Sequence, residues 1–455
     1  MENIKSIRTI ISDLNGIPRG KRLPISHLDK ILESGSRMPL SVLNLDLIGN
    51  DIEKSPLVFE SGDGDGNLYA TERGPIKVTW LKKPTLYLQQ ESFNEDNTPF
   101  EGDPRHALSS ILKRYKNKQL TPVISTELEF CLTNSSGLPT PAISPATGKP
   151  MAGQEILSLQ ELDGLDGFFD DLYEACEEMN ISAQAALTES GLGQFEINLD
   201  HGDALKIADD TWLFRQAARG VALKHNMRAT FMAKPYDTEA GNGLHIHFSV
   251  LDNNGNNIFN DNSKTGSKQL KSAVSGCLDF MKDSTLIFAP NFNSYNRFTA
   301  GAHAPTIINW GYENRTTAIR IPGGTPSARR IEHRVAGGDA NPYLMIAAIL
   351  GAALTGMEGG KEATNPISGN SYEVKGTSII NDWNSAIQCF SSSEKIKGIF
   401  DPLLIRSFID CKTQEFNYFN TKSVDEIKSA LERDNFMTAD VAPVSYTHLT
   451  LPTKA

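Results

Sequence analysis

The sequence lacks several features that mark whole classes of protein. It has only 5 cysteines in 455 residues, an odd number without CxxC spacing, which argues against a disulfide framework and against a zinc ribbon. It has no basic excess, because 44 Lys and Arg stand against 55 Asp and Glu, and the formal net charge of -11 makes a nucleic-acid partner unexpected. It contains neither a Walker A motif nor GxGxxG, so nothing supports a P-loop enzyme or a Rossmann dehydrogenase.

Long hydrophobic runs are also missing. The N-terminal sequence MENIKSIRTIISDLNG has no extended apolar region, so we expect no signal peptide. The longest apolar run, residues 343–357, is shorter than the ~20 residues that a membrane span requires. We interpret this run as a buried core helix. Together with the cysteine usage, these features favour a protein of the reducing cytoplasm without a membrane partner.

The composition that is present, 39% hydrophobic and 22% charged residues, is typical of a globular protein, and the length suits two domains. Residues 1–100 contain short strand-like runs such as IRTIISDL, VTWL and PTLYLQQ, interrupted by Gly, Pro and Asp. At Asp103, an N-cap aspartate is followed by proline, which indicates a helix start. Helical and strand patterns alternate from there on. We therefore expect a protein of mixed helices and strands with domains over 1–100 and 101–442.

The C-terminal end departs from this pattern. The stretch PVSYTHLTLPTKA, residues 443–455, does not continue the helical character of SVDEIKSALERDNFM before it. It resembles translated vector or adapter sequence, so we expect a non-native tail that is no part of the fold.

Two segments carry paired carboxylates. In TELEF, Glu127 and Glu129 are two residues apart on a predicted strand and therefore share one face. Adjacent carboxylates repel and are costly to bury unless a cation or a base compensates; an exposed edge strand is the alternative. In ESGLGQFE, two glycines permit a tight turn between Glu189 and Glu196, and a surface loop is the alternative.

A third segment, GNGLHIHFS, carries two histidines. Alternation places His245, His247 and Ser249 on one face of a strand. The glycine-rich loop before them allows backbone N–H groups to approach an anion. A pair of hydrogen-bonded core histidines is the alternative.

A fourth segment, from Arg315 to Arg334, contains five arginines, and alternation in ARRIEHR places Arg330, Glu332 and Arg334 on one face. The planar fork of arginine suits phosphate and carboxylate, although a salt-bridged sheet surface is the alternative. Taken with the other segments, five carboxylates and a histidine suit a pair of hard divalent cations, Mg²⁺ or Mn²⁺. Metals and arginines together suit a nucleoside triphosphate and a transferring phosphoryl group.

The order and spacing of these segments resemble the glutamine synthetase family. The resemblance runs from DLNGIPRGKRLP to about residue 435 and includes TELEF, ESGLGQFEIN, FMAKP, GNGLHIHFS, NSYNRF, ENRTTAIRIP, ARRIEHR and DANPYL. It implies an α+β fold, with an N-terminal β-grasp domain followed by a catalytic domain of curved antiparallel sheet backed by helices. It also implies a homo-oligomer, a dodecamer of two stacked hexameric rings with active sites between adjacent subunits.

The resemblance further implies a site for ATP, glutamate and an amine with two or more Mg²⁺ or Mn²⁺ ions. The matching ligands of the first metal, which faces glutamate and the amine, are Glu129, Glu189 and Glu196. The matching ligands of the second, which bridges the nucleotide phosphates, are Glu127, His245 and Glu332. His247 and Ser249 match residues that contact the nucleotide. Arg315 and Arg320 match arginines that stabilise the nucleotide and its transferring γ-phosphoryl group. Glutamate-binding positions are matched by Gly241, Arg297 and Arg334.

The implied reaction has two steps. The γ-carboxylate of glutamate attacks the γ-phosphorus of ATP, while positive charge on metals and arginines neutralises the transferring group. A deprotonated amine then attacks the γ-glutamyl phosphate and expels phosphate. A carboxylate-lined pocket favours a cationic amine and helps to remove its proton. Arg315, Glu189 and His303 are the expected catalytic residues.

Departures from the family pattern concern the amine. His303 stands where ammonia-using members have a flap glutamate, and the N-terminal segment lacks their Asp-Gly-Ser-Ser sequence. Ser327 replaces a nucleotide-contacting lysine, and Ala240 replaces an asparagine that helps to hold glutamate. The loss of the flap glutamate and of the Asp-Gly-Ser-Ser sequence argues against ammonia and favours an organic amine. The combination of GNDIE, GDGDG, DPRHAL, WGYENRT and ARRIEHRVAGGDANPYL resembles the glutamate–putrescine ligase branch. For His303 the alternative is a loop histidine without a catalytic role.

Two other functions stay open from the sequence. One is an ammonia-dependent glutamine synthetase, against which His303 and the altered N-terminal loop weigh. The other is a non-catalytic scaffold or regulatory member of the family. Such a protein is expected to lose metal ligands, whereas all six ligand positions are acidic or histidine here.

Overall fold

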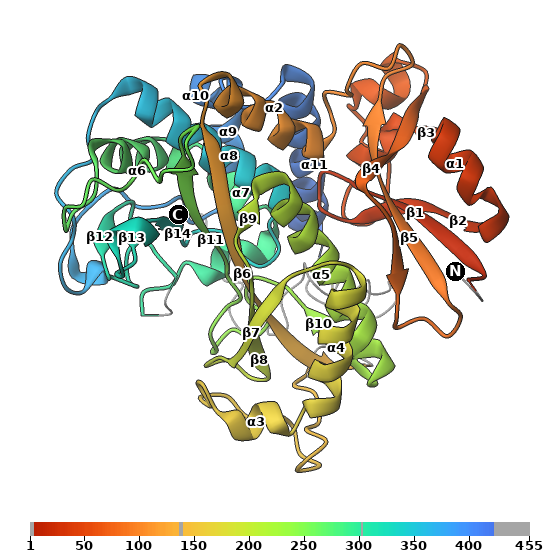
Figure 1. The fold of residues 1–455 in the computed structure, drawn as a ribbon, viewed down its shortest axis with the longest axis horizontal. Helices are drawn as coiled ribbons and strands as arrows, with labels where there is room; N and C mark the ends of the chain where they lie inside the picture. Colours follow the sequence, from red (N-terminus) through yellow and green to blue (C-terminus); the bar gives the residue numbers. More distant parts are fainter. Residues whose placement is uncertain (1–3, 136–139, 302–303, 423–455) are drawn as a thin grey trace.

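The computed structural model describes residues 4–135, 140–301 and 304–422 (Figure 1). The N-terminal part is a five-stranded sheet in the order β2-β1-β5-β4-β3. Its strands are β1 (Ser6–Ser12), β2 (Pro18–Pro24), β3 (Ser36–Pro39), β4 (Asp65–Val78) and β5 (Thr85–Phe93). The central pair β1 and β5 is parallel, and the other pairs are antiparallel. Helix α1 (Leu28–Ser34) connects β2 to β3 and packs Leu28 and Ile31 against Ile7 and Leu88 of the sheet, which is the expected β-grasp arrangement.

The second sheet has nine strands, seven of them in the order β12-β13-β14-β11-β6-β8-β7. Strands β9 and β10 also pair with β6. The bounds are β6 (Thr121–Asn134), β7 (Ala183–Thr188), β8 (Gln194–Leu199), β9 (Gly202–Asp203), β10 (Met227–Thr230), β11 (Leu244–Leu251), β12 (Trp310–Tyr312), β13 (Ile319–Ile321) and β14 (Ile331–His333). All pairs are antiparallel except β12 with β13. The predicted strand at ARRIEHRV is therefore shorter than expected, since only three of its residues pair.

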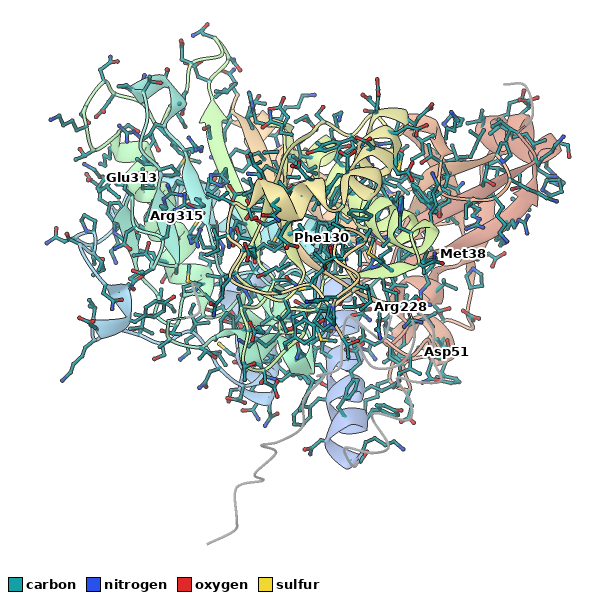
Figure 2. All side chains as sticks on the ribbon, turned by 90° about the horizontal axis from the view of Figure 1, so that it is seen from below. Met38, Asp51, Phe130, Arg228, Glu313 and Arg315 are labelled. Atoms are coloured by element: carbon teal, nitrogen blue, oxygen red, sulfur yellow. The ribbon has the colours of Figure 1, made fainter. Side chains whose placement is uncertain are left out.

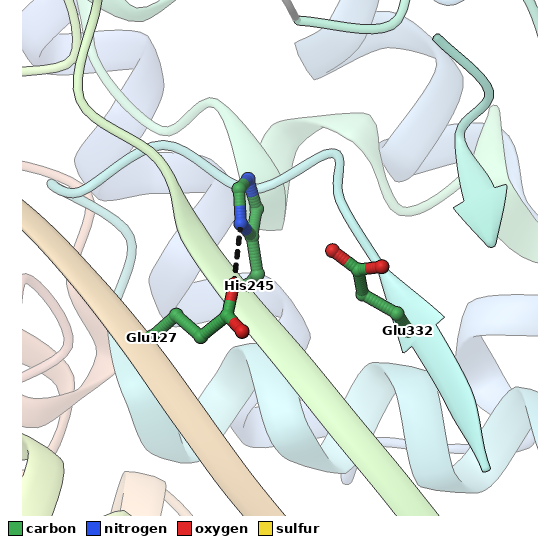
Figure 3. A group of neighbouring side chains, drawn as sticks. All are labelled: Glu127, His245 and Glu332. Atoms are coloured by element: carbon green, nitrogen blue, oxygen red, sulfur yellow. Dashed lines mark hydrogen bonds and ion pairs between the residues drawn. The ribbon is translucent and has the colours of Figure 1, made fainter. Parts of the chain in front are cut away.

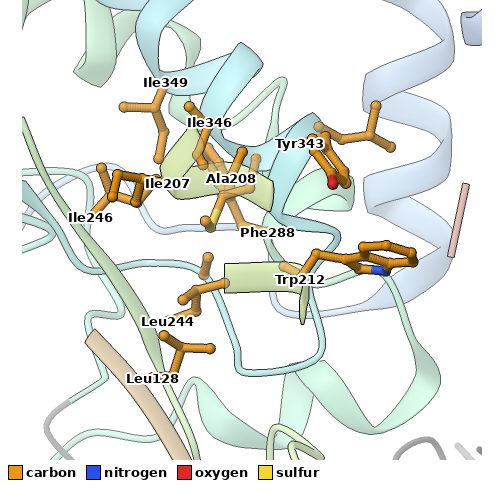
Figure 4. Packing of buried hydrophobic residues seen from close by; sticks show 14 of the residues in the cluster. Leu128, Ile207, Ala208, Trp212, Leu244, Ile246, Phe288, Tyr343, Ile346 and Ile349 are labelled. Atoms are coloured by element: carbon orange, nitrogen blue, oxygen red, sulfur yellow. The ribbon is translucent and has the colours of Figure 1, made fainter. Parts of the chain in front are cut away.

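Ten α-helices accompany this sheet in the described residues. They are α2 (Pro104–Asn117), α3 (Leu159–Asp163), α4 (Asp166–Glu178), α5 (Ala204–Lys224), α6 (Lys268–Met281), α7 (Thr285–Phe288), α8 (Pro342–Gly359), α9 (Trp383–Ser392), α10 (Glu394–Lys397) and α11 (Pro402–Thr421). Among them, α2 and α5 pack on β6. The predicted start of α2 is confirmed, because the Asp103 carboxylate accepts a hydrogen bond from the Arg105 backbone N–H at 2.8 Å and Pro104 is the first helical residue. Figure 4 shows α5 and α8 against Leu128, Leu244 and Ile246 of the sheet.

Helix α8 is the predicted core helix. In the part of the chain that the structure describes, it is the one helix long and apolar enough to cross a membrane by length and composition. Its residues from 342 to 354 are all buried, and 72% of its most apolar window lies inside the fold. The prediction of a core helix is therefore confirmed.

The two faces of strand β6 carry different kinds of side chain. Thr126, Leu128 and Phe130 are buried on the helix side, whereas Glu127 and Glu129 alternate with them and are only half-buried. The strand lies between β11 and β8, so the alternative of an exposed edge strand for TELEF is excluded. One face of the sheet thus packs the core and the other carries the acidic residues.

The two sheets lie on either side of residue 100 in the sequence, since β5 ends at Phe93 and β6 begins at Thr121. They share one hydrophobic core, because Ile10, Leu14 and Tyr87 of the first part belong to the same buried cluster as α5 and α8. The domain boundary near residue 100 stays a prediction. The expected tail at 443–455 lies outside the described residues.

Candidate active site

Strand register brings the acidic and histidine segments together on the open face of the second sheet. Glu127 lies opposite His245 across β6 and β11, and Glu129 lies opposite Glu196 across β6 and β8. On the other side, His247 lies opposite Glu332 across β11 and β14. Opposed residues of antiparallel strands share one face, so side chains from four strands converge.

The first cluster consists of Glu127, His245 and Glu332 (Figure 3). One potential ligand atom from each lies within 4.8 Å of the others. His245 Nδ1 hydrogen-bonds Glu127 Oε2 at 3.2 Å, and His245 Nε2 is buried without a partner among the described residues. Two carboxylates and an imidazole with a free ring nitrogen form a donor set that suits a divalent cation.

The second cluster shares His245 and adds Glu129 and Glu196, again within 4.8 Å of one another. The backbone N–H of Gly243 donates to Glu129 Oε2 at 2.6 Å, which fixes that carboxylate. Glu189, expected in this set, is not one of the three clustered residues. It lies beside them, since burial and then the negative charge of Glu129 raise the pKa of Glu189 to about 7.

The electrostatics of these carboxylates favour a bound cation. Burial, followed by repulsion from Glu127, Glu129 and Glu189, raises the pKa of Glu196 well above its usual range. At Glu127, burial raises the pKa, but hydrogen bonds with His245 and His247 outweigh it and leave the pKa below its usual range. Carboxylates that repel one another in a half-buried site are costly unless positive charge compensates them. The residues present therefore fit Mg²⁺ or Mn²⁺.

Glu332 connects the first cluster to the arginines. The side chain is fully buried, and its Oε2 accepts from Arg320 Nη1 at 2.9 Å while its Oε1 accepts from Arg334 Nη1. Arg320 also contacts the exposed Glu313 at 3.3 Å. Arg315, the other arginine expected at the phosphoryl group, is exposed near Glu313 (Figure 2) and makes no hydrogen bond or ion pair among the described residues, but its positive charge lowers the pKa of Glu189 against the rise caused by burial. Arg320 and Arg334 thus bind the first cluster directly, whereas Arg315 acts on Glu189 through its charge alone.

A cavity of about 910 Å³ opens beside Glu127 and is lined by His247, Ser249 and Arg330. His247 Nε2 lies 2.8 Å from Glu127 Oε1, and Arg330 Nε donates to His247 Nδ1 at 3.2 Å. The Arg330 bond assigns the ring proton to Nε2, which therefore donates to Glu127. Ser249 Oγ donates to the Arg329 carbonyl at 3.0 Å. Arg330 was not predicted as a site residue, although its alternation with Glu332 was a usable signal.

The predicted glutamate-binding positions lie at the other end of the site. Arg297 is the last residue of the 3₁₀ helix η4 (Phe292–Arg297), is buried, and donates from Nη1 to the Val335 carbonyl at 2.8 Å. A Cβ on Gly241 would lie 2.3 Å from the Ala233 carbonyl oxygen and 3.1 Å from Arg297 Cγ. Gly241 is therefore needed for the loop to pass over Arg297.

Gly243 was missed by the sequence reasoning as a site residue. A Cβ there would lie 2.8 Å from both Arg297 Nη2 and His245 Nε2, and 3.4 Å from Glu129 Oε1. Because Gly243 has no side chain, the space between Arg297, His245 and Glu129 stays open. The run GNG before the two histidines was the signal for it. His303, by contrast, lies outside the described residues.

The α+β fold and the acidic, arginine-flanked site define a protein of the glutamine synthetase type. Residues 101–429 match the family described as glutamine synthetase, catalytic domain. The chain is 34% identical over 429 residues to the gamma-glutamylputrescine synthetase PuuA of Escherichia coli strain K12, covering 92% of this chain and 89% of that protein. It is 29% identical over 467 residues to a glutamine synthetase of Staphylococcus aureus strain MW2, covering 96% of each. The solved structure titled "Apo GmaS without ligand" superposes with a TM-score of 0.80 at 27% identity, over 94% of this chain and 97% of that one.

This chain belongs to the glutamine synthetase family and is a ligase of that class. The expected resemblance is thereby confirmed, as is the fold class that it implied. Enzymes of this family use ATP and divalent metal ions, which agrees with the donor chemistry of the two clusters.

Proposed function

We propose that the protein joins the γ-carboxylate of glutamate to an organic amine, putrescine or a related amine, through γ-glutamyl phosphate at the expense of ATP. The observation that carries the proposal is the pair of acidic clusters that share His245 and lie between the 910 Å³ cavity and Arg297. A site for three substrates needs a nucleotide cleft on one side, a carboxylate-binding arginine on the other, and positive charge between them.

Each cluster would hold one cation. Glu127, His245 and Glu332 would bind the ion nearer the cavity, and Glu129 and Glu196, with Glu189 beside them, the ion nearer Arg297. Bound Mg²⁺ or Mn²⁺ supplies positive charge to the triphosphate and to the transferring phosphoryl group. The shared position of His245 accounts for the closeness of the two clusters.

In the first step, a γ-carboxylate oxygen of glutamate forms a bond to the γ-phosphorus, and the bond from that phosphorus to the β,γ-bridging oxygen breaks, releasing ADP. Arg320, which already faces the first cluster, is placed to bind charge on the transferring group, and Arg315 is proposed to join it. His247 and Ser249 line the nucleotide end of the cavity. Arg297 and Arg334, with the open space at Gly241, are proposed to hold glutamate.

In the second step, the amine nitrogen attacks the γ-glutamyl carbon and phosphate leaves. Glu189 is the proposed acceptor of the amine proton, because it lies at the edge of the carboxylate cluster and is half-buried. We retain His303 as a proposed flap residue. An organic acceptor is supported by the 34% identity to a protein named gamma-glutamylputrescine synthetase and by the absence of a flap glutamate at position 303.

A second candidate is an ammonia-dependent glutamine synthetase, which the match to the Staphylococcus protein over 96% of both chains favours. For either activity we propose a cytoplasmic homo-oligomer, a dodecamer of two hexameric rings. Its partners would be small molecules only: glutamate, an amine and ATP.

The test is phosphate release from ATP with glutamate and Mg²⁺, comparing putrescine, other amines and ammonium at matched concentrations. We expect a clear preference for an organic amine, lost in Glu332→Ala. Preference for ammonium would replace the proposal with the second candidate. If no phosphate is released with any acceptor, both activities are contradicted and a non-catalytic scaffold is favoured.

A further inference from the structure

A fully buried ion pair lies far from the acidic clusters in the sequence. Lys412 and Glu415, both on α11, are 0% and 2% exposed, and Lys412 Nζ lies 2.8 Å from Glu415 Oε2. Burying two ions is costly unless each also finds hydrogen-bond partners, and an apolar pair of similar size is often as stable. The partners of this pair therefore indicate what it positions.

On one side the pair holds the N-terminal sheet. Asn15, in the turn between β1 and β2, accepts from Lys412 Nζ at 2.5 Å and donates from Nδ2 to Glu415 Oε1 at 3.0 Å. The same carboxylate oxygen accepts from the Leu47 backbone N–H at 2.9 Å. Two separate loops of the N-terminal part are thus fixed to α11 by one ion pair.

On the other side the pair reaches the turn that carries Arg297. Lys412 Nζ donates to Asn291 Oδ1 at 3.4 Å, and Asn291 Nδ2 donates to Asp339 Oδ2 at 2.8 Å. Ser294 Oγ donates to the same Asp339 oxygen at 2.5 Å. Asn291 and Ser294 also form the capping box of η4, whose last residue is Arg297. All of these residues are buried, so the path from α11 to Arg297 runs through the interior of the protein.

We propose that Lys412 is a positioning residue for the glutamate end of the site: with Glu415 it ties the N-terminal turn at Asn15 to the start of η4 and so fixes where Arg297 stands. The inference rests on the proposed function, in which Arg297 binds glutamate. Loss of the Lys412 charge frees Asn291 to reorient, and the cap of η4 then no longer has one fixed partner. Arg297 lies at the opposite end of this one short helix, so its guanidinium moves with it.

The experiment compares steady-state constants of Lys412→Met, Ser294→Ala and Arg406→Gln with those of the unchanged protein. Arg406 is the matched control: it also joins α11 to the N-terminal part, through Glu60 at 2.5 Å, but at the surface and away from η4. We expect the KM for glutamate to rise ~10-fold in Lys412→Met, with less than about a 2-fold change in the KM for ATP. Ser294→Ala should also raise the KM for glutamate more than the KM for ATP, but by a smaller factor. Arg406→Gln should change neither KM.

Equal changes in both KM values, or a change in kcat alone, would show a merely structural role and overturn the inference. If Lys412→Met does not fold, Ser294→Ala decides, because it removes one hydroxyl from the path and leaves the ion pair intact; an unchanged KM for glutamate there also overturns it. Failure of the proposed function is distinguishable from failure of this inference, because in the first case the unchanged protein itself would release no phosphate in response to glutamate.

Discussion

Replacement of Gly243 by alanine is expected to inactivate the enzyme while leaving the fold intact. The backbone N–H of Gly243 donates to Glu129 Oε2 at 2.6 Å and its carbonyl accepts from the Glu129 backbone N–H at 3.1 Å, and alanine can keep both bonds because they use only the backbone of residue 243. Its φ angle is not in the left-handed region, so alanine is tolerated by the backbone. The new methyl group instead enters the space between Arg297 and His245.

The distances give the size of the effect. The methyl carbon would stand 2.8 Å from both Arg297 Nη2 and His245 Nε2, so each must retreat by at least about 0.6 Å to reach ordinary van der Waals contact. Neither can do so freely, because Arg297 is held by the Val335 carbonyl and His245 by Glu127. Overpacking of this kind costs about 1–3 kcal/mol of stability. Misplacement approaching an ångström in an active site lowers the rate by roughly 10²-fold.

The assay is glutamate-dependent phosphate release, with thermal unfolding measured on the same samples. For a chain of this length, the stability cost corresponds to a fall in Tm of only about 1–3 °C. Gly359→Ala is the control, since a Cβ there meets no atom within 4 Å. Full activity in Gly243→Ala would refute the assignment of this space to the reaction, and a collapse of Tm would show that the residue acts through the fold.

Three further results are expected. Glu332→Gln should abolish stabilisation by Mn²⁺ in a thermal-shift titration, whereas Glu313→Gln, which also faces Arg320 but is exposed, should keep it; equal responses would remove Glu332 from the metal site. In EDTA, the pKa of Glu189 is raised from 4.5 to about 7, so its stabilising contribution is fully present below pH 4.5 and is lost as pH rises through about 7. Relative to Glu189→Gln, the protein should therefore become less stable between pH 4.5 and about 7, and a flat difference would contradict this. Leu128→Ala should cost about 2–5 kcal/mol in chemical denaturation, because Leu128 is buried under α5, and more than Leu32→Ala, which is 45% exposed.

Alternation along single strands was enough to predict much of the site. The period of two in TELEF and in HIHFS placed the two glutamates, the two histidines and Ser249 on one face, and the structure shows that face. Helix boundaries followed from local chemistry as well, as at Asp103. These signals are short-range, because each depends only on residues a few positions apart.

Contacts between segments that are distant in the sequence could not be predicted from the sequence. Nothing local to Arg330 states that its Nε reaches His247, which is 83 positions earlier, and the two meet only because β14 pairs with β11. The path from Lys412 to Asn291 joins α11 to η4 across 121 positions and depends on packing of both against the N-terminal turn. Arg315 shows the reverse case: it stands in a strong motif, yet among the described residues it makes no hydrogen bond or ion pair with the clusters and acts on Glu189 only through its charge.

The same register that builds the site also builds the core, which limits how the site can vary. A slip of β11 by one residue against β6 would turn Leu244 and Ile246 toward the cavity and bury His245 and His247 against α5 and α8. The cost of that exchange makes the register strict, so the two carboxylate clusters are held by hydrophobic burial on the opposite face rather than by their own contacts. Variation among substrates must then come from residues outside the paired strands, such as Ala240 and Ser327, which depart from the family pattern.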